Sequence, residues 1–120
     1  METTRQQKVA RLILKEIGEL ILRDLAWVSP GSMVTATVVR VSPDLSFAKV
    51  YFSIFGKEPA PAVMEKLEDN KSKIRYILGQ KLRHQLRIVP ELAFFHDDSA
   101  AYADRISQLL DRNEKDQSES

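Results

Sequence analysis

The change in hydrophobic pattern over the first 55 residues most constrains how this chain can fold. Thr3 and Thr4 are each followed three residues later by a glutamine, a capping-box spacing that predicts the start of a helix. Apolar residues then recur every three or four positions, which predicts a helix with one packing face that runs to about Asp24. This apolar stripe consists of Val9, Ile13, Ile17, Leu20 and Ile21.

A Ser-Pro-Gly sequence at residues 29–31 ends the helical pattern. Residues 33–42 are rich in Val and Thr, residues 47–55 are rich in aromatic side chains, and a Ser-Pro-Asp sequence at 42–44 lies between them. Two such runs around a turn predict a β-hairpin. A turn centred on Asp44 and Leu45 pairs Val39 with Val50, Thr37 with Phe52, Arg40 with Lys49, and Val38 with Tyr51.

The second half of the chain predicts two helices, a third strand and a final helix. We expect helices over residues 60–69 and 72–86, separated by Asn70-Lys71-Ser72, because Asn and Ser favour caps and kinks over helix interiors. Residues 88–95 predict the third strand. Asp98 or Ser99 can cap a last helix with a packing stripe of Tyr102, Ile106, Leu109 and Leu110.

This order of elements predicts an α+β fold in which helices pack on a three-stranded sheet. The 120 residues suit one domain, which we expect over residues 1–112, followed by a disordered polar tail at 113–120. The sequence has no apolar run of 18 residues and no signal-peptide pattern, so a membrane partner is not expected and a cytoplasmic location is.

Catalytic and metal-binding chemistry find little support in the sequence. With no cysteine, the chain cannot form a disulfide framework, a thiolate zinc site, an iron–sulfur cluster or a cysteine nucleophile. The run His96-Asp97-Asp98-Ser99 contains the residue types of a catalytic triad or a metal site, but neighbours on a strand point to opposite faces and the ligand spacing is not a recognised one. We therefore predict no catalytic residue, no metal and no cofactor.

The cationic residues point instead to a polyanionic partner. Residues 71–90 contain six cationic side chains and no carboxylate, namely Lys71, Lys73, Arg75, Lys81, Arg83 and Arg87. On the predicted helix over 72–86, an apolar face lies opposite a face formed by Lys73, Tyr76, Gln80, Arg83 and Arg87. On the first helix, Lys8, Arg11 and Lys15 lie away from most of the apolar stripe, where they face either water or phosphate.

Sequence-reading RNA modules use a GxxG loop or exposed aromatic side chains on a sheet. No glycine pair has the GxxG spacing in this chain. Phe47, Tyr51 and Phe55 on the predicted hairpin either form a stacking platform or pack in the core or at an edge.

Several segments resemble the bacterial ribosome-binding factor A family. The most specific is LRIVPELAFFHDDS at residues 86–99, supported by KIR at 73–75, LG at 78–79 and DLSFAKVY at 44–51. The likeness extends from the first helix to about Leu110. It implies a type II KH-like domain with a kinked helix pair in place of the GxxG loop. The kink usually carries an Ala-x-Gly pattern, and here Asn70, Lys71 and Ser72 take its place.

The resemblance also implies a non-enzymatic assembly factor that binds the small (30S) ribosomal subunit and assists late maturation and processing of 16S rRNA, notably in the cold. We expect a monomer that takes no small-molecule substrate. The expected RNA-binding residues are Lys8, Arg11, Lys15, Lys71, Lys73, Arg75, Tyr76, Arg83 and Arg87. The alternative is a protein-interaction module that makes no RNA contact and binds its partner independently of salt.

Overall fold

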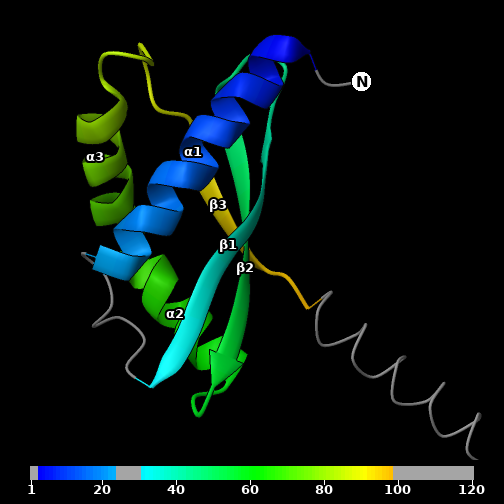
Figure 1. Ribbon diagram of the computed structural model, residues 1–120, viewed down its shortest axis with the longest axis vertical. Coiled ribbons are helices and arrows are strands. Elements are labelled where there is room, and N and C mark those ends of the chain that lie inside the picture. Colours follow the sequence, from blue (N-terminus) through cyan, green and yellow to red (C-terminus); the bar gives the residue numbers. More distant parts are fainter. Residues whose placement is uncertain (1–2, 24–30, 99–120) are drawn as a thin grey trace, which may run out of the picture.

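The computed structural model describes residues 3–23 and 31–98 of the chain (Figure 1). Its elements are α1 (Thr4–Arg23), β1 (Ser32–Val41), β2 (Phe47–Gly56), α2 (Ala60–Asp69), α3 (Lys71–Leu82) and β3 (Glu91–His96). The order of elements predicted up to β3 is therefore confirmed. The predicted final helix and the polar tail at 113–120 lie outside the described residues.

The three strands form one mixed sheet in the order β1-β2-β3. β1 and β2 pair antiparallel, and β3 runs parallel to β2 because the α2–α3 pair carries the chain back between them. α1, α2 and α3 lie on the same side of this sheet (Figure 1). The core lies between the two layers and includes the whole apolar stripe predicted for α1, each member of which is at most 5% exposed.

α1 begins with a capping box formed by Thr3 and Gln6. The backbone N–H of Gln6 donates to Oγ1 of Thr3 at 3.1 Å, and the backbone N–H of Thr3 donates to Oε1 of Gln6 at 2.8 Å. Gln6 is only 4% exposed, and its Nε2 also donates to the carbonyl of Val41 at 2.9 Å. One side chain therefore caps α1 and ties it to the end of β1.

The hairpin pairs largely as predicted, with one exception. Val38, Val39 and Arg40 face their expected partners, but Thr37 does not pair with Phe52, because a β-bulge shifts the register and Ala36 takes that place. The bulged residue is bonded elsewhere, since Oγ1 of Thr37 donates to Oδ2 of Asp97 at 2.7 Å. The period-two pattern of the strand carries no signal for this extra residue.

The helix break consists of Asn70 alone, so the prediction that all three residues of Asn70-Lys71-Ser72 interrupt the helices is wrong. Lys71 and Ser72 lie in the first turn of α3. Asn70 has φ −101° and ψ 8°, outside the helical region, and its Nδ2 donates to the carbonyl of Lys66 at 2.8 Å. Its own carbonyl accepts from the N–H of Ile74 at 2.9 Å. The side chain thus bonds a carbonyl at the end of α2 while the backbone starts α3.

α3 ends at Leu82, and the prediction that it extends to Leu86 is wrong. Residues 83–85 form a turn instead. The first residue of β3, Glu91, pairs with the first residue of β2, Phe47. The chain therefore has to turn after α3 in order to enter β3 at this end of the sheet. Helical periodicity alone cannot show this constraint. Arg83 and Arg87 therefore lie in the connection that follows α3 and not on its face.

The third strand begins at Glu91, three residues later than the predicted Ile88. Pro90 has no N–H to offer the sheet. The carbonyls of Val89 and Pro90 accept from the guanidinium of Arg75, at 2.8 and 3.2 Å. The backbone of this segment is therefore bonded to α3 rather than to β2.

Among the described residues, no helix has the length and apolar character to cross a membrane.

Candidate nucleic-acid interface

The predicted cations of α1 are exposed, as expected. Lys8, Arg11 and Lys15 follow one another at spacings of three and four, so they form one row along the helix. The buried face of the same helix packs on β1 and α3, which fixes the direction of this row. The row is therefore a rigid line of positive charge.

The cations near the end of α3 are exposed as well, although on a different element from the predicted one. Arg83 lies in the turn after the helix, and Arg87 lies in the segment that leads to β3. Lys73 and Tyr76 are on α3 itself, and Tyr76 is 68% exposed. We call Lys8, Arg11, Lys15, Arg83 and Arg87 the cationic surface.

Lys71 and Arg75 have partners within the fold. Nζ of Lys71 is 2.8 Å from Oε2 of Glu68 and lies 5.7 Å from the centre of the Phe94 ring. Arg75 donates to two carbonyls of the segment before β3, and its Nη2 is 3.5 Å from Oε1 of Glu91. These two side chains support the packing of α3, a role that charge patterning does not distinguish from binding.

A pocket of about 420 Å³ lies beside α3 and β3. It brings together three of the predicted residues, Lys71, Arg75 and Tyr76, with Glu91 on its wall. Because Glu91 contributes a carboxylate and both cations are partnered, this pocket offers less net positive charge than the cationic surface.

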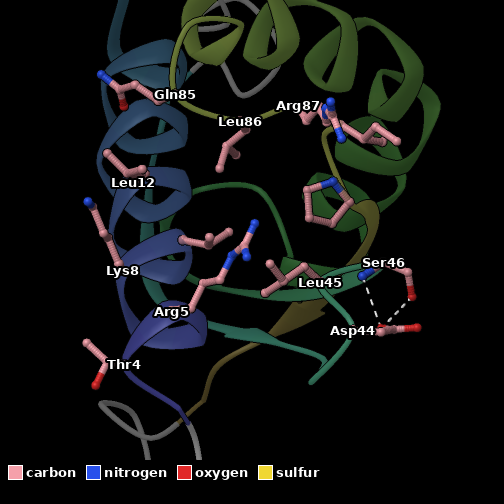
Figure 2. A pocket seen from close by; sticks show the side chains of 13 residues that line it. Thr4, Arg5, Lys8, Leu12, Asp44, Leu45, Ser46, Gln85, Leu86 and Arg87 are labelled. Carbon is pink, nitrogen blue, oxygen red and sulfur yellow. Dashed lines mark hydrogen bonds between the residues drawn. The ribbon is translucent and has the colours of Figure 1, made fainter.

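A larger pocket, of about 770 Å³, joins the two groups of cations (Figure 2). We call it the α1–hairpin pocket. Its walls come from the first half of α1, the β1–β2 turn and the segment after α3. Lys8 from α1 and Arg87 from the segment after α3 both line it, together with Arg5. Arg5 was missed by the sequence analysis, although it precedes Lys8 by three residues and so continues the same row.

Asp44 is the acidic residue among those that line this pocket. Its Oδ1 accepts from the hydroxyls of Ser42 and Ser46, both at 2.7 Å, and from the N–H of Ser46 at 3.1 Å. These bonds lower the pKa of Asp44 from 3.8 to about 2, with the hydroxyl of Ser42 as the largest cause. Figure 2 shows this carboxylate turned toward its own loop. One of the two carboxylate oxygens, Oδ1, is thus bonded within the turn.

The aromatic residues of the hairpin lie on the sheet face that α1, α2 and α3 leave uncovered. Tyr51 stacks on Phe95, with ring centres 5.3 Å apart. Phe47 and Phe55 are exposed. Tyr51 is therefore half-buried against a neighbouring ring and Phe47 and Phe55 face outward, while a platform on which bases stack stays a prediction.

The triad-like residues do not assemble into a site. His96 is exposed at the end of β3, and Asp97 binds Thr37 at the bulge while its N–H donates to the carbonyl of Phe52 at 2.7 Å. Asp97 thus secures the end of the sheet. Ser99 lies outside the described residues. Within residues 3–23 and 31–98, no three His, Asp or Glu side chains are grouped so that they could hold a metal ion.

The element order, the parallel β2–β3 pair and the helix–break–helix between them define the class of this protein. It is a KH-like domain of type II in which one residue, Asn70, separates α2 from α3. The chain belongs to the ribosome-binding factor A family. The sequence profile of the family described as ribosome-binding factor A matches residues 5–110.

Relatives and solved structures agree with this assignment. The chain is 41% identical to the ribosome-binding factor A of Cytophaga hutchinsonii over 93% of this chain and 84% of that protein. It is also 41% identical to that of Chlorobium phaeobacteroides over 94% of this chain and 97% of the relative.

The crystal structure of ribosome-binding factor A from Thermus thermophilus superposes with a TM-score of 0.62 at 20% identity, covering 76% of this chain and 94% of that one. A homology model of the Thermus thermophilus factor, fitted into a cryo-EM map of a 30S complex, superposes with a TM-score of 0.58 at 22% identity, covering 82% and 97%. At these identities the two likenesses concern the fold.

Proposed function

We propose that this protein is a non-catalytic assembly factor that binds the small (30S) ribosomal subunit and contacts 16S rRNA through its cationic surface. The observation that carries the proposal is the junction at the α1–hairpin pocket. Cations distant in the sequence, Lys8 and Arg87, line one pocket there and extend from it along α1 and toward α3. Folded RNA presents a continuous array of phosphates, and Lys and Arg on rigid elements match such an array.

The family supports the subunit as partner. The Thermus thermophilus factor, which shares the fold, has been fitted into a map of a 30S complex. Within our proposal, Lys73 and exposed Tyr76 extend the contact along α3, with the tyrosine available for stacking or for a hydrogen bond. Lys71 and Arg75 act mainly by holding α3 in place, because they reach RNA only by giving up internal contacts.

Charge reversal tests the proposal directly. Arg83→Glu combined with Arg87→Glu is expected to abolish co-sedimentation with purified small subunits, since two phosphate contacts are replaced by repulsion. Both side chains are exposed, so the folded state and its circular dichroism spectrum should be unchanged. The matched control is Lys49→Glu combined with Lys57→Glu, which changes the net charge equally at exposed positions outside the cationic surface. Unchanged co-sedimentation of the Arg83 and Arg87 variant would remove these residues from the interface.

We extend the proposal to late maturation of 16S rRNA in the cytoplasm by a monomer, with the largest requirement in the cold. In cells that depend on this protein, the variant with Arg83→Glu and Arg87→Glu should accumulate precursor 16S rRNA, most strongly at low growth temperature. Mature 16S ends at normal levels in such cells would count against a role in maturation. Sedimentation equilibrium of the purified chain checks the monomer, and a concentration-dependent mass would contradict it.

The exposed Phe47 and Phe55 favour the alternative, a protein-interaction module. This function predicts that Phe55→Ala weakens subunit binding, that reversal of Arg83 and Arg87 does not, and that added salt has little effect. The two functions therefore differ in three measurable outcomes.

A further inference from the structure

The α1–hairpin pocket combines two kinds of wall. Its apolar lining consists of aliphatic side chains and a proline, namely Val9, Leu12, Leu45, Leu86, Ile88 and Pro90. Three cations, Arg5, Lys8 and Arg87, border this apolar wall. Figure 2 shows Arg5 reaching into the space between Leu12, Leu86 and Leu45. A ligand that satisfies both walls needs an apolar surface and negative charge in the same small volume.

The apolar wall is already formed in the protein without a ligand. Leu45 has φ +62°, in the left-handed region that costs a leucine energy, and the hydrogen bonds of Asp44 to Ser42 and Ser46 fix the turn around it. This strained turn directs Leu45 toward the pocket (Figure 2). Ile88 also lines the pocket and is 76% exposed, so its side chain is open to contact by a ligand.

The size and position of the pocket limit the ligand further. A volume of about 770 Å³ suits a ligand of one or two nucleotides and is far too small for a duplex. Lys8 and Arg87, from the two parts of the cationic surface, both line the pocket. A polyanion that contacts these cations therefore crosses the apolar wall of the pocket. In an RNA chain, the group with apolar faces that could contact this wall is the base. Pockets for extruded bases hold them between apolar side chains, and Arg planes can stack on them.

We propose that the α1–hairpin pocket binds one unpaired nucleotide of single-stranded RNA. The base lies against Leu12, Leu86 and Ile88, and the flanking phosphates bind Arg5 and Arg87. The inference rests on the proposed function and adds to it a site for an unpaired base, separate from the helix break at Asn70 and at the other end of α3. An acidic peptide with an apolar anchor could contact the same apolar and cationic side chains. It would not supply the regular row of negative charges that matches Lys8, Arg11 and Lys15, as a phosphate backbone does.

The test uses the full chain and three RNA hexamers of adenosine. One carries 2-aminopurine at its centre, one is abasic at all six positions, and one is unmodified. Binding of a base in the pocket should make the abasic hexamer bind about tenfold more weakly than the unmodified one. The fluorescence of 2-aminopurine should rise on binding, because the base leaves the stack of its neighbours for aliphatic walls.

Two alanine variants with matched exposure separate the pocket from the rest of the surface. Ile88→Ala removes part of the apolar wall, and Leu22→Ala removes a side chain of equal exposure, 76%, near the other end of α1. Ile88→Ala is expected to weaken binding of the unmodified hexamer about threefold or more and to leave the affinity for the abasic hexamer unchanged. Leu22→Ala should change neither. Since both positions are exposed, neither variant should fail to fold.

Three results would overturn the inference. Equal affinity for the abasic and unmodified hexamers, with the salt dependence of RNA binding retained, would remove the base pocket and leave the proposed function standing. If the unchanged protein bound neither hexamer and did not bind the small subunit, both proposals would be refuted. Binding of a glutamate hexapeptide with one central leucine that depends on Ile88, while binding of the RNA hexamers does not, would assign the pocket to a protein ligand.

Discussion

Replacing Gln6 by alanine removes one side chain that makes two structural connections. Its Oε1 accepts from the N–H of Thr3 in the capping box, and its Nε2 donates to the carbonyl of Val41 on the edge strand β1. Loss of the cap costs about 1 kcal/mol. Depriving the Val41 carbonyl of a buried donor costs about 1–3 kcal/mol more. We therefore expect the free energy of unfolding to fall by about 2–4 kcal/mol.

Urea unfolding followed by circular dichroism measures this loss, with an unchanged m-value as the check that only stability has moved. Gln7→Ala is the matched control. It has the capping spacing to Thr4 that Gln6 has to Thr3, but it is exposed, so it should change stability by less than about 0.5 kcal/mol. Thr3→Ala removes the cap and keeps the bond to Val41, so it should cost about 1 kcal/mol. A Gln6→Ala loss no larger than that of Gln7→Ala would refute the reasoning.

Three further predictions concern the stability of the fold at Arg75, Gly56 and Asp44. Arg75→Ala should lower the free energy of unfolding by about 2 kcal/mol, because the segment before β3 loses two charge-assisted hydrogen bonds, and it should weaken subunit binding far less than reversal of Arg83 and Arg87. Gly56→Ala should cost at least about 2 kcal/mol, because Gly56 has φ +140° and an added Cβ would lie 2.5 Å from the backbone of β1. Asp44 should stabilise the turn fully above about pH 4 and lose this effect as the pH falls toward 2, since its pKa is lowered from 3.8 to about 2.

Each of these predictions has a contrary result. If the Arg75→Ala variant had normal stability but did not bind the subunit, the main role of Arg75 would be RNA binding and not the support of α3. Gly18→Ala is the control for Gly56, because no atom outside its own stretch of helix lies within 4 Å of its added Cβ, and it should raise stability by roughly 0.5–1 kcal/mol. Equal effects at the two glycines would contradict the steric argument. For Asp44, an Asp44→Ala variant that loses stability between pH 4 and 2 as steeply as the parent would show that other groups govern this range.

The sequence predicted the elements whose pattern is local. The stripe of α1 is buried as expected, because a period of 3.6 specifies one face of a helix. α2 occupies residues 60–69 as predicted, bounded by Pro59 and Asn70. The cations Lys8, Arg11 and Lys15 are exposed for the same reason that the stripe is buried.

The features that were missed depend on contacts between distant segments. The bulge at Thr37 is satisfied by Asp97, and the early end of α3 follows from the position of β3. RNA binding by Arg75 stays a prediction, but nothing in the sequence indicated that its guanidinium also donates to the carbonyls of Val89 and Pro90, in the segment that leads to β3. Charge patterning cannot separate these two uses, because both require only a cation on α3.

The salt dependence of subunit binding tests the central claim most directly. Contact of the five members of the cationic surface with phosphate predicts that the logarithm of the affinity falls with the logarithm of salt concentration with a slope of about −3.5, at roughly −0.7 per phosphate. Reversal of Arg83 and Arg87 should make this slope shallower. A slope near zero, measured by sedimentation with small subunits, would contradict the account and mean that protein surfaces carry the docking.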